Sequence, residues 1–266
     1  MSDRRADQSL DHGFAKLLPA VRTIAREAGQ VILRYYTDTV TAHVKSDGSP
    51  VTAADHAAEA VILPALHHLT PDIPVISEEQ HAAGKSPPGD HGTYWLVDPL
   101  DGTRSFVEHT GEFTVNIGLV KDGVPVLGVM YLPVDGDLYA AAGPGTAVHC
   151  VQGRGDVPIS ARMVPPDGLV VLSSRRHGDR ERLDRFLEGK LVKEHRHSSS
   201  ALKFCLIARG EVDVYPRFGP TCEWDTAAGH AILLAAGGSI ETPDGKPLGY
   251  GKPDFLNGEF IAYGRR

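Results

Sequence analysis

Residues 95–106 read W-L-V-D-P-L-D-G-T-R-S-F, and this stretch constrains the fold more than any other. The apolar run that precedes Asp98 is typical of a short buried strand. Because proline lacks the backbone N–H that a strand ladder uses, we expect Pro99 to end that strand. Asp98 and, three residues later, Asp101 would then leave the strand end on a tight turn. The chain must therefore place two carboxylates together at the end of a buried strand.

The turn itself offers further polar groups. The carbonyl oxygen of Leu100 lies between the two carboxylates, and oxygen ligands of this kind suit a hard cation. The backbone N–H groups of Gly102 and Thr103 would open the helical turn that follows, where such groups attract phosphate. The alternative is an ordinary D-P-x-D-G turn, which many soluble proteins contain. These residues alone leave both interpretations open.

The composition excludes several classes of protein. The chain has 266 residues, and no apolar run approaches the ~20 residues of a membrane span. The N-terminal segment lacks the apolar stretch of a signal peptide. A net charge of −7 argues against binding to nucleic acid polymers. Three scattered cysteines are too few for a disulfide framework, so we expect a cytoplasmic protein. Peripheral association with the inner face of the membrane is the alternative location.

The order of the expected elements divides the chain into two halves. Sequential strands dominate the first half, which predicts an N-terminal α+β domain over 1–155. Strands and helices alternate in the second, which predicts a C-terminal α/β domain over 156–266. We expect Pro64 to kink or interrupt the helix in which it lies. Helices are expected at 14–36, from near 55 to 69, 179–187, 199–209 and 225–236, and strands at 40–44, 74–77, 94–97, 113–120, 124–132, 138–142, 147–151, 169–173, 191–194, 212–215 and 239–241.

Acidic residues recur where the expected elements open onto loops, namely at Asp55, Glu78, Asp98, Asp101 and Asp225. Each has an ordinary explanation by itself, since a carboxylate at a helix start caps the helix or compensates its dipole. Together they point to a site, because the sites of layered α/β proteins lie at such loop ends. Clustered carboxylates repel one another unless a cation neutralises them, and oxygen-only ligands favour Mg²⁺ or Mn²⁺ over zinc. The pattern therefore favours a magnesium site that acts on a phosphate ester.

Five motifs resemble those of the inositol monophosphatase superfamily in order and spacing, over most of the chain. They are S-P-V-T-A-A-D (49–55), S-E-E (77–79), D-P-L-D-G-T (98–103), G-E-F-T-V-N-I (111–117) and W-D-T-A-A-G (224–229). The resemblance implies a layered α/β/α/β/α sandwich of the sugar-phosphatase type and a magnesium-dependent, lithium-sensitive phosphatase. Within the superfamily, a set of motifs is similar to the CysQ-type branch of 3′(2′),5′-bisphosphate nucleotidases. They are D-P-L-D-G-T-R-S-F (98–106) with G-E-F-T-V-N-I (111–117), S-S-A-L-K-F-C (199–205), Y-P-R-F-G-P-T (215–221) and E-W-D-T-A-A-G-H (223–230).

The resemblance implies a role for each matching position. Two magnesium ions, with a weaker third, would be held by Glu78, Asp98, Asp101, Asp225 and the carbonyl oxygen of Leu100; Mn²⁺ is a possible substitute. The attacking water would be oriented and deprotonated by Thr103 with Asp55. The phosphate to be cleaved would lie against the amides of Gly102 and Thr103.

The nucleotide part of the substrate would be held, again by resemblance, by His177, Ser200, Lys203 and Arg217. A lysine and an arginine fit a dianionic second phosphate, which an uncharged polyol lacks. Each of these residues also has an ordinary alternative. Lys203 could lie on a solvated helix face, Ser200 could cap a helix, and His177 could be an exposed loop residue.

The implied reaction removes the 3′-phosphate from adenosine 3′,5′-bisphosphate, a by-product of sulfate assimilation, and yields AMP and phosphate. Inositol-1-phosphate or histidinol-phosphate hydrolysis is the alternative within the superfamily, because all members share the metal half of the site. A regulator that binds phosphorylated nucleotides without turnover is the alternative from another class. The partner is thus a small phosphorylated molecule, and the resemblance leaves monomer and homodimer open.

Overall fold

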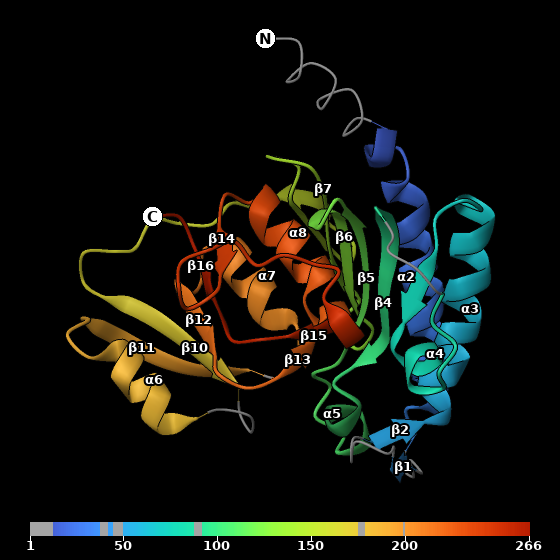
Figure 1. The fold of residues 1–266 in the computed structure, drawn as a ribbon, viewed down its shortest axis with the longest axis horizontal. Helices are drawn as coiled ribbons and strands as arrows, with labels where there is room; N and C mark the ends of the chain where they lie inside the picture. Colours follow the sequence, from blue (N-terminus) through green and yellow to red (C-terminus); the bar gives the residue numbers. More distant parts are fainter. Residues whose placement is uncertain (1–12, 38–41, 45–49, 88–91, 175–178, 199) are drawn as a thin grey trace.

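The computed structural model describes residues 13–37, 42–44, 50–87, 92–174, 179–198 and 200–266. Five layers are stacked across the molecule in the order α/β/α/β/α (Figure 1). They run from the blue and cyan N-terminal helices through a seven-stranded sheet, the central helices and a five-stranded sheet to an outer helix. The layered sandwich that the family resemblance implies is confirmed.

The seven-stranded sheet has the order β3-β4-β5-β6-β7-β8-β9. Its strands pair antiparallel, except that β3 runs parallel to β4. The central strands are buried on both faces because helices cover both sides of the sheet. The strands are β3 (Val75–Ser77), β4 (Thr93–Asp101), β5 (Thr114–Lys121), β6 (Val124–Leu132), β7 (Asp137–Ala142), β8 (Val148–Val151) and β9 (Gly155–Pro158).

Helices α2 (Leu18–Tyr35) and α3 (Ala53–Leu69) form the outer layer on this sheet. Buried residues recur on α2 at helical spacing, from Val21 to Ile32, and pack in one core with the inward residues of the sheet. The helix α3 does not end at Pro64 and continues to Leu69, so the interruption that we considered is not found. Packing between α2 and α3 offsets the hydrogen bond that the proline cannot donate.

The central layer consists of α7 (Leu202–Ala208) and α8 (Ala227–Ala235). Gly118 of β5 and Gly128 of β6 are cross-strand partners beneath α8. A Cβ atom on Gly128 would lie 2.2 Å from the carbonyl oxygen of Ala228, so the approach requires glycine. This contact brings the start of α8, and the residues just before it, beside β4 and β5.

The five-stranded sheet has the order β11-β10-β12-β16-β14. Strands β10, β11 and β12 are parallel, whereas β16 runs antiparallel to both of its neighbours. The outer helix α6 (Arg180–Leu187) packs Leu183, Phe186 and Leu187 onto the far face of the sheet. The strands are β10 (Leu169–Ser174), β11 (Val192–Ser198), β12 (Val214–Arg217), β14 (Ser239–Glu241) and β16 (Phe260–Tyr263).

Short elements complete the described part of the chain. Figure 1 shows the β1–β2 pair, α4 and α5 at one end of the seven-stranded sheet. None of the described helices combines the length and apolar character that a membrane span requires. The short elements are β1 (Ala42–Val44), β2 (Pro50–Thr52), α4 (Glu78–Ala82), α5 (Thr103–Val107), β13 (Thr221–Cys222), the 3₁₀ helix η1 (Glu223–Asp225), the 3₁₀ helix η2 (Pro253–Phe255) and β15 (Leu256–Asn257).

Two C-terminal helices are shorter than expected. The helix predicted over 199–209 begins only at Leu202, because Ser200 has a φ of +57°, outside the right-handed helical region. The helix predicted to begin at position 225 begins at Ala227 and is preceded by the 3₁₀ turn.

The boundary proposed at 155/156 falls within β9, which pairs with β8. The division into two domains stays a prediction.

Candidate active site

The end of β4 carries the first two predicted carboxylates. The expectation that Pro99 ends this strand is wrong, because β4 continues to Asp101 and shifts its register against β5 between Asp98 and Asp101. The irregularity accommodates a proline inside a central strand, where a regular ladder would need its N–H. Asp98 is only 2% exposed, and its Oδ1 accepts a hydrogen bond from the N–H of Leu100 at 3.0 Å.

The turn after β4 depends on glycine. Gly102 has a φ of +92°, and a Cβ atom there would lie 2.9 Å from the carbonyl oxygen of Glu112. Thr103 then begins α5, and its Oγ1 lies 3.1 Å from Oδ1 of Asp55 and 3.2 Å from the carbonyl oxygen of Leu100. The structure therefore brings together the threonine and the aspartate to which the family resemblance assigns the catalytic roles.

The two carboxylate oxygens of Asp55 have different partners. Its Oδ2 accepts the backbone N–H of Thr52 at 2.8 Å and the hydroxyl of Thr52 at 2.7 Å, which forms the capping box of α3. Its Oδ1 faces Thr103. One oxygen of Asp55 thus stabilises the start of the helix through the capping box, and the cap also fixes the direction of the other oxygen.

Asp225 comes from the C-terminal half of the chain but lies against the seven-stranded sheet. It is the last residue of η1, which contacts β4 and β5. Its Oδ2 accepts the N–H of Cys222 at 2.8 Å. This bond closes the 3₁₀ turn and orients the carboxylate.

Glu78 follows the strand next to β4. It is the first residue of α4, directly after β3, and Ser77 of β3 is the register partner of Val97 of β4. Glu78 and Asp98 each come one residue after this register pair, so they lie at the same level on neighbouring parallel segments. Glu59 of α3 fixes this strand end, since its Oε1 accepts the hydroxyl of Ser77 at 2.5 Å.

The predicted carboxylates lie close enough to affect one another. Burial raises the pKa of Asp98 well above its usual value, and the charges of Glu78, Asp101, Asp225 and Asp55 raise it further. The pKa of Asp225 is also raised well above its usual value, by loss of solvation and then by Asp101 and Glu78. This is the mutual repulsion that a bound divalent cation relieves.

Asp101 shows what a cation would have to compete with. Its Oδ2 accepts hydrogen bonds from the hydroxyl of Ser200 at 2.7 Å and from the N–H of Ala201. Within the described ranges, no three side chains of His, Cys, Asp or Glu stand in an arrangement that would hold a metal ion as it is. A cation that binds Asp101 would compete with the Ser200 hydroxyl and the Ala201 N–H for Oδ2.

Lys203 is a buried cation beside this cluster. It is 5% exposed on α7, so the alternative of a solvated helix face is wrong. Its Nζ donates to the carbonyl oxygen of Ser200 and lies 5.2 Å from the ring centroid of Tyr215. Burial lowers the pKa of Lys203 to about 8, although the negative charge of Asp101 opposes that shift.

Arg217 ends β12 on the same side of the site. Its Nε donates to the carbonyl oxygen of Gly219 at 3.2 Å, and its Nη2 donates to that of Pro220 at 2.9 Å. The charge of Arg217 opposes the rise in the pKa of Asp225 and adds to the fall in the pKa of Lys203, so Arg217 acts on both groups. His177, the remaining predicted substrate contact, lies outside the described residues.

Two polar residues at the site were not predicted individually. Thr114 and Asn116 of β5 point their Oγ1 and Nδ2 atoms at Oδ2 of Asp101, each at 3.4 Å. Asn116 is 1% exposed, and its Oδ1 has no hydrogen-bond partner among the described residues. The signal for both is the T-V-N spacing inside an apolar strand, which places two polar side chains on one face.

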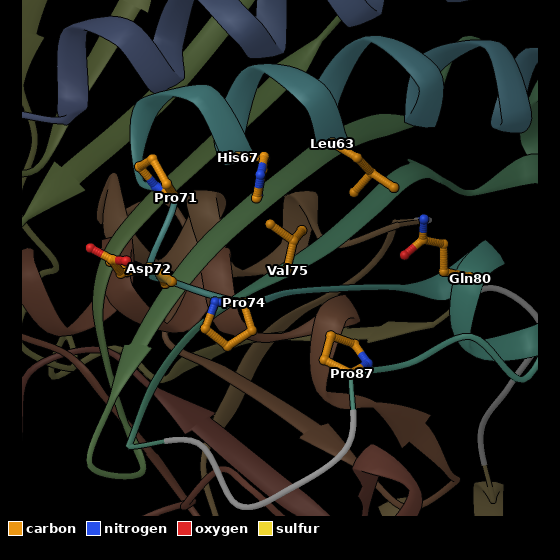
Figure 2. A pocket seen from close by; sticks show the side chains of 9 residues that line it. Leu63, His67, Pro71, Asp72, Pro74, Val75, Gln80 and Pro87 are labelled. Atoms are coloured by element: carbon orange, nitrogen blue, oxygen red, sulfur yellow. The ribbon is translucent and has the colours of Figure 1, made fainter.

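A cavity of about 460 Å³ lies apart from these residues, between α3, the segment 71–75 and α4 (Figure 2). Its lining is largely apolar, with Leu63, Pro74 and Val75 as examples and His67 beside them. None of the nine residues that line it is a predicted site residue. It is therefore separate from the candidate active site.

The comparison with protein families identifies the fold. The model of the inositol monophosphatase family matches residues 15–264. The chain belongs to this family. It is 48% identical over 255 residues to 3′(2′),5′-bisphosphate nucleotidase CysQ of Escherichia coli (strain K12), which covers 92% of this chain and 98% of that protein.

Solved structures agree with this assignment. The crystal structure of CysQ from Bacteroides thetaiotaomicron is similar with a TM-score of 0.77 and 37% identity, over 93% of this chain and 96% of that one. Inositol monophosphatase from Anabaena (Nostoc) sp. PCC 7120 is similar with a TM-score of 0.73 and 28% identity, over 95% and 92% of the two chains. Both branches of the family thus share the fold of this chain.

Proposed function

We propose that this chain is a magnesium-dependent 3′(2′),5′-bisphosphate nucleotidase that hydrolyses the 3′-phosphate of adenosine 3′,5′-bisphosphate to AMP and phosphate. The observation that carries the proposal is a site with two opposed sides. Carboxylates from four separate segments repel one another around Asp98, and Lys203 and Arg217 stand beside them. The 48% identity to a CysQ nucleotidase supports this choice of substrate.

The chemistry of the donor set fits magnesium. Only oxygen atoms are offered, and hard divalent cations prefer such ligands. Two ions, with a weaker third, would be held by Glu78, Asp98, Asp101, Asp225 and the carbonyl oxygen of Leu100, and Mn²⁺ would substitute. When bound, Mg²⁺ supplies charge neutralisation of the phosphate and lowers the pKa of water.

Thr103 and Asp55 would together accept the proton of the attacking water. The hydroxyl of Thr103 donates to Oδ1 of Asp55 at 3.1 Å, so its lone pairs are available to a water molecule. As that water attacks phosphorus, its proton passes to Oγ1 of Thr103, while the threonine proton passes to Asp55. Because the other oxygen of Asp55 is fixed by the capping box, the carboxylate acts from a set position.

Lys203 and Arg217 would bind the 5′-phosphate, with Ser200 and His177 contacting the rest of the nucleotide. Both cations at present donate to backbone carbonyl oxygens of their own segments. A dianionic phosphate is a stronger acceptor than a carbonyl, so it would replace these bonds. The Gly102 and Thr103 amides would contact the phosphate that is cleaved.

Other members of the family act on inositol-1-phosphate or histidinol phosphate, and a regulator without turnover is a further alternative. The test is a panel of these two monoesters and adenosine 3′,5′-bisphosphate, with and without Mg²⁺, read as released phosphate. We expect the highest kcat/KM for the bisphosphate, by about tenfold or more, since a charge-assisted hydrogen bond contributes ~1.5–3 kcal/mol. Preference for inositol-1-phosphate, or no Mg²⁺-dependent release, would contradict the proposal.

Location and domain organisation are parts of the same proposal. The three cysteines are all free, as in proteins of reducing compartments, which supports a place in the cytoplasm. The presence of two main sheets supports a division near positions 155/156, although β9 extends the first sheet to Pro158.

A further inference from the structure

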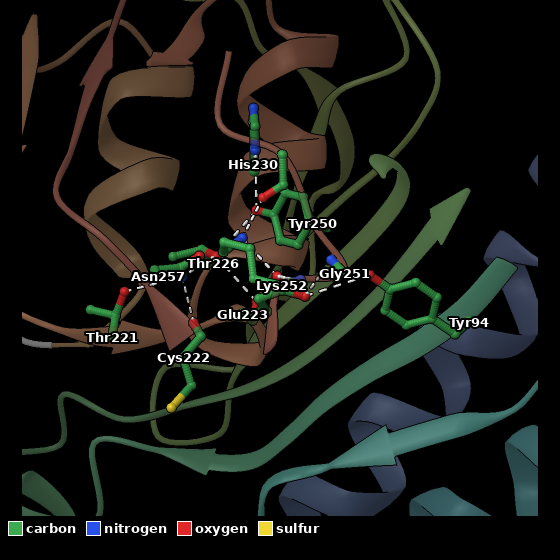
Figure 3. A network of polar contacts seen from close by, with 11 residues as sticks. Tyr94, Thr221, Cys222, Glu223, Thr226, His230, Tyr250, Gly251, Lys252 and Asn257 are labelled. Carbon is green, nitrogen blue, oxygen red and sulfur yellow. Dashed lines mark hydrogen bonds and ion pairs between the residues drawn. The ribbon is translucent and has the colours of Figure 1, made fainter. Parts of the chain in front are cut away.

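A buried polar network surrounds Glu223, which shares the 3₁₀ turn η1 with Asp225 (Figure 3). Its centre is Glu223, the first residue of η1, which has no exposed surface. Glu223 stands two residues before Asp225 in the same 3₁₀ turn, yet neither the capping box of that turn nor the proposed reaction uses its side chain. A fully buried carboxylate is costly unless its partners hold it, so its contacts indicate what it does.

The contacts of Glu223 join three separate segments. Its Oε1 accepts the backbone N–H of Lys252 at 2.9 Å and lies 2.6 Å from Nζ of the same lysine. Its Oε2 accepts the N–H of Gly251 at 3.0 Å and faces the hydroxyl of Tyr94 at 3.5 Å. Tyr94 belongs to β4, the strand that ends in Asp98 and Asp101. Glu223 therefore links the turn of Asp225 to the strand of the other carboxylates.

A second set of bonds fixes the backbone of the same turn. Nδ2 of the buried Asn257 donates to the carbonyl oxygen of Cys222 at 2.8 Å and to Oγ1 of Thr226 at 3.1 Å. The hydroxyl of Thr226 donates to the carbonyl oxygen of Glu223 at 3.1 Å, and the hydroxyl of Tyr250 donates to Thr226. Figure 3 shows these side chains grouped around the turn. The turn is thus held on both sides of Asp225.

We infer that Glu223 is a positioning residue that holds the turn of Asp225 against β4 and thereby sets the affinity of the site for divalent cations. The inference rests on the proposed role of Asp225 as a ligand. The outer partners of metal ligands commonly affect affinity by about 10–100-fold because they fix ligand orientation. Glu223 would act in this way through the backbone of the turn, without contacting the ion.

The test measures cation binding without substrate. Free Mn²⁺ is followed by electron paramagnetic resonance in titrations of the full chain, and thermal unfolding is recorded for each variant. Glu223→Gln removes the ion pair and one acceptor oxygen while keeping the shape. We expect the Mn²⁺ dissociation constant to rise by about tenfold or more. With the metal saturating, we expect the KM for adenosine 3′,5′-bisphosphate to stay at the wild-type value.

The chain offers a matched control in Asp213. This carboxylate is also fully buried, pairs with Arg162 at 2.8 Å and accepts the N–H of Val170 at 2.7 Å. It precedes β12, at the opposite end of that strand from Arg217. Asp213→Asn should lower thermal stability as Glu223→Gln does, and leave Mn²⁺ affinity unchanged. Equal affinity losses in both variants would overturn the inference, since general destabilisation would explain them.

Lys252→Met distinguishes a positioning role of Glu223 from an effect of the charges of the Glu223–Lys252 pair on metal affinity. This variant removes Nζ, adds net negative charge and leaves the backbone bonds of Glu223 in place. Positioning predicts a weaker Mn²⁺ affinity, by a smaller factor than in Glu223→Gln. Tighter binding in Lys252→Met would mean that the electric field of the pair sets the affinity, and would overturn the inference even if Glu223→Gln fails to fold.

Asp225→Asn distinguishes this inference from the proposed function. If Mn²⁺ binding depends on Asp225 but is unchanged in Glu223→Gln, the positioning role is wrong and the ligand assignment stands. If Mn²⁺ binding does not depend on Asp225, the ligand assignment itself fails, and the inference fails with it.

Discussion

The acidic and basic sides of the candidate site are built in different ways. On the acidic side, backbone N–H groups hold the carboxylates in place: Leu100 donates to Asp98, and Cys222 donates to Asp225. On the basic side, the cations of Lys203 and Arg217 donate to carbonyl oxygens of their own segments. Asp98 and Asp225 are thus oriented by bonds that can persist when a cation binds, whereas the basic groups must exchange theirs for a substrate.

This difference suggests how one fold serves several substrates. The acidic side is fixed by the ends of the neighbouring strands β3 and β4 and by the turn of η1, so it provides the same chemistry for any phosphate ester. The basic side depends on two side chains and on the segments after β11 and β12. Changes there alter which molecule binds without disturbing the reaction centre, in keeping with function residing in sites rather than in the fold.

The largest effect should come from the acidic side. Asp101→Asn keeps the shape of the side chain but removes its charge, so we expect Mg²⁺-dependent activity on every substrate to fall by about 1,000-fold or more, because metal-ion stabilisation contributes several kcal/mol. The asparagine oxygen can still accept from Ser200 and Ala201, so the thermal midpoint should change little. Phosphate release and thermal unfolding measure the two. Near-normal activity would refute the ligand assignment.

A smaller and selective effect should come from the basic side. In Lys203→Met with Arg217→Ala, we expect kcat/KM for adenosine 3′,5′-bisphosphate to fall by about 100-fold or more, since two charge-assisted hydrogen bonds of ~1.5–3 kcal/mol each are lost. The value for inositol-1-phosphate should stay close to that of the wild type.

The matched control for this double variant changes one lysine and one arginine on the exposed strand β11, Lys193→Met with Arg196→Ala. It should leave both substrates unaffected. Equal losses on the bisphosphate and on inositol-1-phosphate in the site variant would remove the distinction between the two sides.

The smallest effect concerns pH and tests the acidic side alone. The pKa values of Asp98 and Asp225 are raised in the folded, metal-free protein. These two groups therefore contribute fully to stability below pH ~4, the pKa of an aspartate in the unfolded chain. Their contribution is lost as the pH rises through their raised pKa values in the folded state. Mg²⁺ relieves the repulsion, so the rise in thermal midpoint on adding Mg²⁺ should be larger near pH 8 than near pH 5.5, by about 2–4 °C per kcal/mol.

Thermal scans with and without Mg²⁺ at the two pH values measure this difference. Taking the difference between scans cancels the pH dependence of groups elsewhere, including the buried His230, whose pKa is lowered to about 3. A larger Mg²⁺ effect at the acidic pH would show that Asp98 and Asp225 are not the groups that the ion relieves.

The sequence alone placed the carboxylates at the ends of the right elements. Asp55 at a helix start and Glu78 at a strand end follow from signals within a few neighbouring residues, namely apolar periodicity and capping chemistry. The same local reasoning failed at Pro99, where pairing with β5 extends the strand to Asp101 through an irregular register. Long-range pairing overrode the local preference of proline.

What only the tertiary structure decided is which of these groups meet. Asp101 and Ser200 are 99 residues apart in the chain, and their contact depends on the packing of the central helices between two sheets. The burial of Lys203 and of Glu223 has the same origin, because a charged residue is buried only where distant segments supply its partners. Local sequence fixes where a side chain leaves the backbone, and the packing of the layers fixes what it faces.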